Sequence, residues 1–448
     1  MSGNDRRVVV IGAGFTGLAA AYQLARQGTN VTVVESDSGV GGLAGSFEVG
    51  GELLEKFYHH WFTSDSHIVQ LIKELGTEER IAYRPTTTGV YVSNSLFKLS
   101  GPLDVLRFTP LRLSDRIRLG MLVLRARAIK DWRRLETLTA EEWLLRSGCS
   151  EVYRVVWEPL LRNKFGPYAS HVSAVWLWNK LRLRGGSRNK KGGEVLAYYR
   201  GGFGALAERI AAEIDATGGE IRRNVSATGL IVEAGRVRGV CTSQGNIAAD
   251  AVIASTALPV VAGLAKEHVP PSYVEQLQRI QYLANICLVL ELDRRLSQIY
   301  WLNVSEPGFP FVGVIEHTNL ESPKTYGGRH IVYLSKYLSR DDPLYQMDER
   351  SVMQYCVPHL QRIFPRFEQN WIRAYHLWRA PYAQPVVVRG YGALVPQAET
   401  PIPGVYIASM AQIYPEDRGT NYAVRDGRAI AGKVSEFLRR STKAPQAA

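Results

Sequence analysis

The 448-residue chain lacks several features that mark common protein classes. It has four cysteines, far apart and without a Cys-x-x-Cys pair: Cys149, Cys241, Cys287 and Cys356. This pattern predicts neither a disulfide framework nor a zinc site, we expect no metal ion, and a reducing cytoplasm is the favoured compartment. No apolar run reaches the roughly 18 residues that a membrane-spanning helix needs.

The chain also has fewer negative than positive side chains. The sequence has 54 Lys and Arg against 42 Asp and Glu, a net charge of +12. Such an excess is either a solvated basic surface or a sign of an anionic partner, such as a phosphorylated substrate or an acidic membrane face. No nucleic-acid motif accompanies the charge, so a nucleic-acid partner is not expected.

The N-terminal segment contains, one after another, the parts of a βαβ nucleotide-binding site. Val8–Ile11 is an apolar run typical of a central parallel strand, and Gly12-Ala13-Gly14-Phe15-Thr16-Gly17 follows directly. Apolar residues at helical spacing then lead to Gly28, and Val31–Val34 predicts a second strand that ends at Glu35. The order strand, glycine loop, helix, strand and acid is far more specific than the glycine motif alone.

Each residue type in this unit has a physical reason. Gly12 permits a tight turn, Gly14 allows a pyrophosphate to approach the positive end of the helix, and Gly17 allows close packing. Phe15 and Thr16 lie in the same loop. Glu35 is expected to accept hydrogen bonds from the adenosine ribose, and its charge disfavours the extra phosphate of NADP.

The residues after this acid identify the cofactor. Glu35, Ser36 and the run from Gly39 to Gly45 (GVGGLAG) resemble the extended motif of the amine oxidase superfamily of flavoproteins, which includes protoporphyrinogen oxidase, phytoene desaturase and UDP-galactopyranose mutase. The resemblance implies non-covalently bound FAD, with Gly41 and Gly42 against its pyrophosphate and Leu43 and Ala44 near the flavin.

The same resemblance implies a fold and its division. We expect an α/β protein with a Rossmann-like FAD-binding domain of the glutathione-reductase type and an inserted α+β substrate domain. Segments 1–90, 200–269 and 386–448 would form the first domain, and segments 91–199 and 270–385 the second. A helix is predicted from Ser114 to about Arg134, and a capping box at Thr139 and Glu142.

Two later stretches are expected to contact the cofactor. The family places the backbone of one strand residue against the adenine, and the matching residue here is Val225. An ordinary buried valine in a strand explains Val225 equally well. It also points a helix N-terminus at the flavin, here Gly419, Thr420 and Asn421. The family usually has Gly-Asp after the preceding strand, whereas this chain has Ser409-Met410. Either Asp417 substitutes for that acid or backbone groups suffice.

Catalytic candidates come from two runs. In Glu55–Thr63 (EKFYHHWFT), which is similar to the His-rich segment of UDP-galactopyranose mutases, His59 or His60 can contact flavin or substrate and handle a proton. The resemblance implies that Tyr414 and Arg418, with Asn421, lie in the loop that borders the active site. Arg418 could equally be a salt-bridge partner of Glu416 or Asp417.

Further basic residues allow more than one reading. Arg162 and Lys164 fit surface or structural charges better than an anion site, and 180–191 is predicted to be a mobile basic loop. Such basic segments could also contact a membrane peripherally. The contact would then be with the inner, cytoplasmic face of that membrane.

The expected function is that of an FAD-dependent oxidoreductase of the dehydrogenase or desaturase type, acting on a small or lipid-linked substrate that can carry phosphate. One alternative is a redox-neutral, mutase-like flavoenzyme acting on a nucleotide- or lipid-linked sugar. A flavin-free carrier of prenylated proteins, of the GDP-dissociation-inhibitor type, is less consistent with the intact glycine motif.

Overall fold

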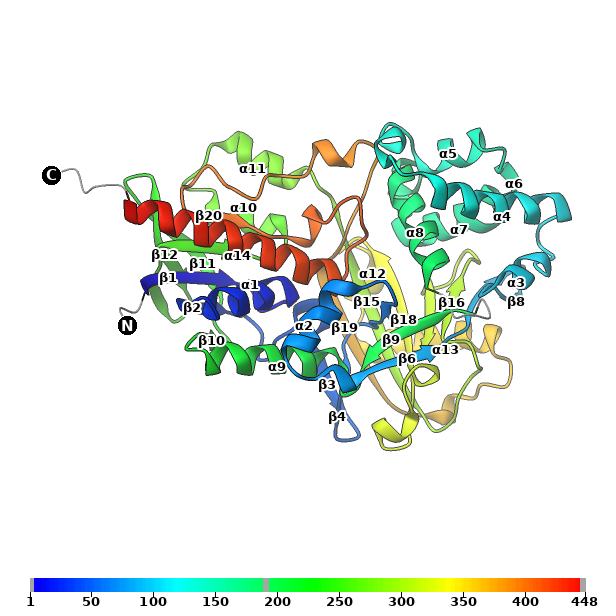
Figure 1. The fold of residues 1–448 in the computed structure, drawn as a ribbon. Coiled ribbons are helices and arrows are strands. Elements are labelled where there is room, and N and C mark those ends of the chain that lie inside the picture. The colour runs from blue at the N-terminus through cyan, green and yellow to red at the C-terminus, as the bar shows by residue number, and fades with distance from the viewer. Residues whose placement is uncertain (1–3, 188–192, 444–448) are drawn as a thin grey trace.

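The computed structural model describes residues 4–187 and 193–443. A parallel five-stranded sheet forms one end of the molecule, with the strand order β10-β2-β1-β14-β20 (Figure 1). Its strands are β1 (Asn4–Ile11), β2 (Thr29–Val34), β10 (Glu220–Arg222), β14 (Ala251–Ala254) and β20 (Val405–Ile407). Three segments far apart in the sequence thus build one sheet.

The central strand β1 is buried on both faces. Val8 and Val10 belong to one apolar cluster, and Val9 and Ile11 to another, as the two-residue side-chain period of a strand requires. The first cluster lies under α1 (Phe15–Ala25), α9 (Gly202–Ala216) and α14 (Thr420–Lys443). The second lies under the antiparallel strands β11 (Ala227–Glu233), β12 (Arg236–Thr242) and β13 (Gly245–Ala248).

A second, seven-stranded sheet has the order β19-β15-β18-β17-β16-β7-β8. Its strands are β7 (Thr88–Val92), β8 (Ser95–Lys98), β15 (Tyr282–Leu292), β16 (Trp301–Val304), β17 (Gly313–Glu316), β18 (His330–Leu338) and β19 (Ile372–Pro385). Helix α13 (Glu349–Ile363) packs on one face of this sheet, and α12 (Pro343–Gln346) precedes it.

Short elements connect the two sheets. They are β3 (Ser46–Val49), β4 (Glu52–Glu55), β5 (Trp61–Phe62), α2 (Ser66–Glu74), β6 (Ile81–Pro85), β9 (Val195–Tyr199), α10 (Leu258–Ala265) and α11 (Pro271–Gln278).

A helical lobe lies at the opposite end of the molecule from the parallel sheet (Figure 1). It contains α3 (Pro102–Leu106), α4 (Leu113–Ala128), α5 (Ala140–Arg146), α6 (Ser150–Val152), α7 (Glu158–Phe165), the turn η5 (Gly166–His171) and α8 (Ala174–Gly186). The fold is therefore the predicted α/β architecture with a parallel sheet and an additional α+β part. The exact limits of the two domains stay a prediction.

Some local predictions were wrong in detail. Helix α4 has Arg112 as its N-cap and ends at Ala128, so Ser114 is no cap and the helix stops short of Arg134. The predicted basic loop is helical from Lys180 to Gly186, because α8 continues through those residues, and 188–192 lie outside the described residues. The capping box of Thr139 and Glu142 is confirmed by reciprocal hydrogen bonds of 3.0 and 3.2 Å. Within the described residues no helix is long and apolar enough to cross a membrane.

Candidate active site

Two glycine loops lie side by side at the end of β1. Gly12 turns the chain with a φ of +99°, and Gly14 caps α1 without any side-chain hydrogen bond or acidic residue in the first turn. The N–H of Gly41 donates to the carbonyl of Ala13 at 2.8 Å, and Gly14 and Gly41 form an isolated parallel bridge. The predicted pyrophosphate-binding segments therefore meet through their backbones.

The glycines differ in the space around them. A Cβ on Gly17 would lie 2.0 Å from the carbonyl oxygen of Gly12, so this glycine is required by packing. A Cβ on Gly14 would meet nothing closer than the Cα of Gly42 at 3.9 Å. The open side of Gly14 therefore faces a gap lined by backbone at a helix N-terminus, which fits a pyrophosphate.

Glu35 is held in place by backbone amides. Its carboxylate accepts hydrogen bonds from the N–H of Ala13 at 2.7 Å, the N–H of Asp37 at 2.8 Å and the hydroxyl of Ser36 at 3.2 Å. The N–H of Val225 donates to the carbonyl of Glu35 at 2.8 Å, and the Val225 side chain is buried. The two predicted adenosine-binding positions therefore lie next to each other, at the end of β2.

The other predicted cofactor residues line the same region. Phe15 is buried with its ring against Phe203, and Thr16 is buried in α1. Leu43 and the buried Ala44 lie in a short helical turn, Gly42–Ala44, that follows Gly41. These placements are compatible with FAD, and their contacts with it stay predictions.

The N-terminus of α14 is tied to the segment that contains the two histidines. The indole N–H of Trp61 donates to the hydroxyl of Thr420 at 2.7 Å, and Gly419 has open space at its Cβ position. The side-chain oxygen of Asn421 accepts hydrogen bonds from the N–H groups of His67 and Ile68 at 2.9 and 3.1 Å. The side chain of Asn421 therefore caps α2, a role that the sequence did not indicate.

His59 and His60 point to different partners. Nδ1 of His59 is 2.6 Å from the carbonyl oxygen of Phe57, so this nitrogen carries the proton and Nε2 is the acceptor. Burial, together with the charge of Arg418, lowers the pKa of His59 to about 4, so its ring is neutral at neutral pH. Nδ1 of His60 lies 3.0 Å from the hydroxyl of Tyr300.

Arg418 is fixed by two strands of the seven-stranded sheet. Its guanidinium donates to the hydroxyl of Tyr337 in β18 at 2.9 Å and to the side-chain oxygen of Gln384 in β19 at 3.1 Å. Next to it, Asp417 forms an ion pair with Lys180 of α8. Arg418 and His59 therefore lie in one site, to which α8, β18 and β19 also contribute.

Lys164 completes a group of cations around Asp417. Its ammonium lies 5.2 Å from the ring centre of Tyr337 and 5.0 Å from that of Trp176. Burial alone would raise the pKa of Asp417, but Lys180, Lys164 and Arg418 outweigh it and lower this pKa to about 2. We call Lys164, Lys180 and Arg418 the cation cluster.

Lys164 was expected to be a surface or structural charge rather than part of an anion site, and it is half-buried between aromatic rings. Arg162, two residues earlier, is exposed and paired with Glu158 at 2.8 Å, as a surface charge should be. Sequence reasoning missed Tyr337 and Gln384 entirely, because nothing in the alternation of β18 or β19 distinguishes them from other strand residues.

Tyr414 has different surroundings from Arg418. Its hydroxyl donates to the carboxylate of Glu136, and its ring packs between Trp132 and Tyr391. Burial and Glu136 raise its pKa far above the ordinary range. Tyr414 is therefore bound to the helical lobe, and a catalytic role for it stays a prediction.

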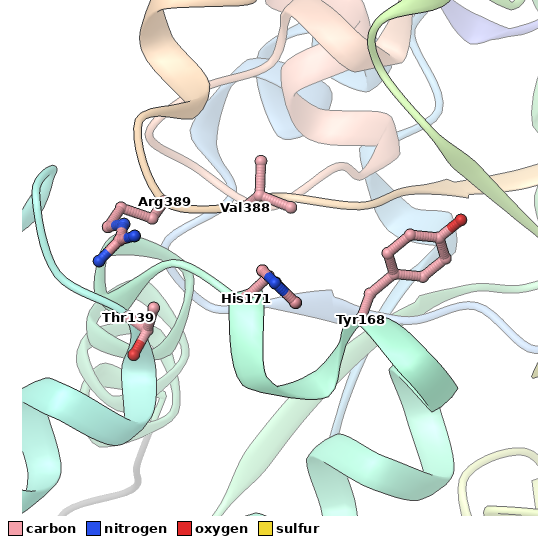
Figure 2. A pocket seen from close by; sticks show the side chains of 5 residues that line it. All are labelled: Thr139, Tyr168, His171, Val388 and Arg389. Carbon is pink, nitrogen blue, oxygen red and sulfur yellow. The ribbon is translucent and has the colours of Figure 1, made fainter.

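A pocket of about 380 Å³ lies between η5 and the segment 386–389, which follows β19 (Figure 2). Its lining residues are Thr139, Tyr168, His171, Val388 and Arg389. None of these residues belongs to the glycine loops or to the cation cluster, so we do not assign the cofactor to this pocket.

The residues present fit FAD. Backbone amides at Gly12–Gly17 and Gly41–Gly42 would hold its pyrophosphate, Glu35 its ribose, and the start of α14 would face the flavin. Among the described residues, no group of three His, Cys, Asp or Glu side chains could hold a metal ion.

Comparison with known proteins agrees with this geometry. Residues 15–435 match the family described as flavin containing amine oxidoreductase. A structure from Exiguobacterium sp. 255-15, provisionally named a protoporphyrinogen oxidase, superimposes with a TM-score of 0.77 at 18% identity, covering 97% of this chain and 99% of that one. A structure of reduced UDP-galactopyranose mutase gives a TM-score of 0.73 at 15% identity, covering 96% and 97%.

The curated relatives align with only part of this chain. The mitochondrial protoporphyrinogen oxidase of Nicotiana tabacum is 32% identical over 105 residues, which are 23% of this chain and 21% of that protein. This similarity therefore covers only about a fifth of the relative's length.

Proposed function

Because the chain belongs to the family of flavin-containing amine oxidoreductases, we propose that it is an FAD-dependent dehydrogenase or desaturase whose substrate carries an anionic group. The family gives the cofactor, and bound FAD would supply the redox chemistry by taking up a hydride from the substrate. The substrate class has to come from the residues of the site.

The cation cluster is the observation that carries this proposal. Lys180 and Arg418 are held by partners on separate elements, and Lys164 lies between rings, so none of them is a mobile surface side chain. Asp417 offsets one of these charges and positions Lys180. A carboxylate or phosphate would be attracted by the combined positive potential of Lys164, Lys180 and Arg418.

The surroundings favour an apolar body attached to that anionic group. Tyr337 and Trp176 present ring faces around Lys164. His59 is neutral and offers Nε2 as an acceptor, so it can orient a substrate hydroxyl or N–H without adding charge. A small or lipid-linked acid or phosphate meets these conditions, as do the acidic porphyrinogens that some relatives oxidise.

Two variants on helix α7 test the proposal. The flavin of the purified protein should absorb near ~450 nm, and its bleaching without oxygen reports hydride transfer. The test panel is protoporphyrinogen, coproporphyrinogen and a polyprenyl phosphate. Lys164→Met should raise the KM for an anionic substrate about tenfold and change kcat less, because a binding charge is lost. Arg162→Met, the exposed neighbour, should leave both values unchanged.

Other outcomes separate the alternatives. Equal effects of Lys164→Met and Arg162→Met would reject an anion site at the cation cluster. Turnover that requires pre-reduced flavin and shows no net electron transfer would support a mutase-like enzyme. A colourless protein that cannot take up FAD would contradict both enzymes and leave the carrier hypothesis.

A further inference from the structure

Helix α4 has two apolar faces, and the fold uses only one of them. Leu119, Leu122 and Ala126 are buried in the core of the helical lobe. On the outer face, four large apolar side chains follow each other at helical spacing, with exposed fractions of 60% for Leu113, 51% for Ile117, 42% for Met121 and 64% for Leu124. This spacing places the four on one continuous stripe.

Helix α3 packs against α4 and adds two exposed leucines. Leu103 and Leu106 are 67% and 46% exposed. Arg116 of α4 donates to the carbonyl oxygens of Leu106 at 2.7 Å and Leu111 at 2.8 Å, which fastens α3 to α4. We call these six exposed residues and the helices that carry them the α3–α4 surface. Single exposed apolar residues are common on soluble proteins, but six of them on two adjoining helices indicate a contact surface.

Positive charge is concentrated around this surface. Residues 102–134 contain nine Lys and Arg against three Asp, a net of six positive charges and half of the +12 of the whole chain. Asp115 is buried and paired with Arg118 at 2.7 Å. Arg107, Arg127 and Lys130 form no ion pair within the described residues and are exposed.

We propose that the α3–α4 surface docks onto a membrane that contains anionic lipids. Apolar side chains on an exposed helix can enter the boundary between headgroups and acyl chains, while arginines at its edges meet lipid phosphates. The lobe that carries α3 and α4 forms the end of the molecule opposite the parallel sheet, so it can approach a surface without obstruction by that sheet (Figure 1).

The surface lies one helix away from the cation cluster. Helix α8 packs against α4, and the indole N–H of Trp178 donates to the carbonyl oxygen of Ala126 at 2.8 Å. The same helix carries Lys180, which binds Asp417. If the proposed function holds, a lipid-linked substrate would have a short path from the bilayer. Docking itself does not depend on that function and is measured without substrate.

Flotation of the FAD-loaded protein with vesicles tests the docking. The vesicles are phosphatidylcholine alone or with about 30% phosphatidylglycerol. Wild-type protein should float with the anionic vesicles. Ile117→Ser/Leu124→Ser should lower the partition coefficient at least about tenfold, because two inserted side chains are removed. Arg107→Ser/Arg127→Ser should lower it about thirtyfold on anionic vesicles at low salt, and much less on neutral ones.

Val260→Ser/Tyr355→Ser is the matched control, because both residues are exposed apolar side chains on other helices, α10 and α13. This pair should bind vesicles like the wild type. The proposal is overturned if the wild type does not float, or if the Ile117/Leu124 pair binds as well as the control. A wild-type dimer that this pair converts to a monomer would also overturn it, because a second copy would then cover the surface.

Discussion

Gly427 of α14 lies directly against the backbone of Thr16 in α1. A Cβ at position 427 would be 2.3 Å from the carbonyl oxygen of Thr16 and 2.9 Å from the Cβ of Ala19. The two helices that present their N-termini to the cofactor region can therefore cross closely only because residue 427 has no side chain.

Gly427→Ala should destabilise the protein by about 1–3 kcal/mol, because backbone would have to move to admit the methyl group. Gly432→Ala is the control in the same helix, since nothing lies within 4 Å of its Cβ position. Alanine there should stabilise by up to about 1 kcal/mol through helix propensity. Urea unfolding of the FAD-loaded variants measures both changes. A Gly427→Ala protein as stable as the wild type would show that the helices can separate at little cost.

Gly14 and Gly39 give a matched pair for the pyrophosphate site. Gly14→Val should abolish retention of FAD, because its side chain would occupy the gap between the two glycine loops. Gly39→Val lies in the same second loop, where nothing approaches the Cβ position, and should keep the flavin. The ratio of flavin to protein absorbance after desalting gives the answer. Normal flavin content in Gly14→Val would place the pyrophosphate elsewhere.

Asn421 allows a structural role to be separated from a role at the flavin. Asn421→Ala leaves the N–H groups of His67 and Ile68 without their acceptor and should cost about 1 kcal/mol in the free energy of unfolding. Asn421→Asp keeps an acceptor oxygen and should remain close to the wild type. Both should retain FAD. Loss of FAD with unchanged stability would instead support the predicted direct contact.

The sequence predicted those parts of the protein that depend on neighbours along the chain. The βαβ unit around Gly12–Gly17 and the capping box at Thr139 are local patterns of spacing and turn chemistry, and both are present. The wrong prediction for the C-terminal end of α4 has a local cause as well. Its helical pattern continues past Ala128, while the chain leaves the helix because Ile129 is extended, with ψ of +110°.

The cation cluster could not be found in that way. Lys164, Lys180 and Arg418 lie on α7, on α8 and before α14, and only tertiary packing brings them together around Asp417. Gly427 is a similar case. From the sequence alone, a glycine within a helix only lowers the helix propensity, and its packing role becomes visible once the crossing helix is known. Clusters of charge and close helix crossings are properties of the assembled fold.

The last prediction concerns Glu55, a carboxyl buried at the end of β4. It accepts hydrogen bonds from the N–H of Phe203 at 2.6 Å and from the hydroxyl of Tyr198 at 2.9 Å. Burial raises its pKa to about 7 although these hydrogen bonds lower it. In the unfolded chain a glutamate titrates near ~4.3. Between these values the folded protein therefore binds a proton that the unfolded chain has lost.

Stability from this group is complete below the pKa of the unfolded chain and is lost as the pH rises through about 7. The loss can reach roughly 1.4 kcal/mol per pH unit within that window. Glu55→Gln cannot ionise, so its free energy of unfolding relative to the wild type should rise from pH 5 to 7 and then level off. Glu52→Gln, exposed on the same strand, should follow the wild-type curve. A constant difference between Glu55→Gln and wild type across this range would mean that Glu55 is already ionised in the folded protein at pH 5, with its charge stabilised by Tyr198 and Phe203.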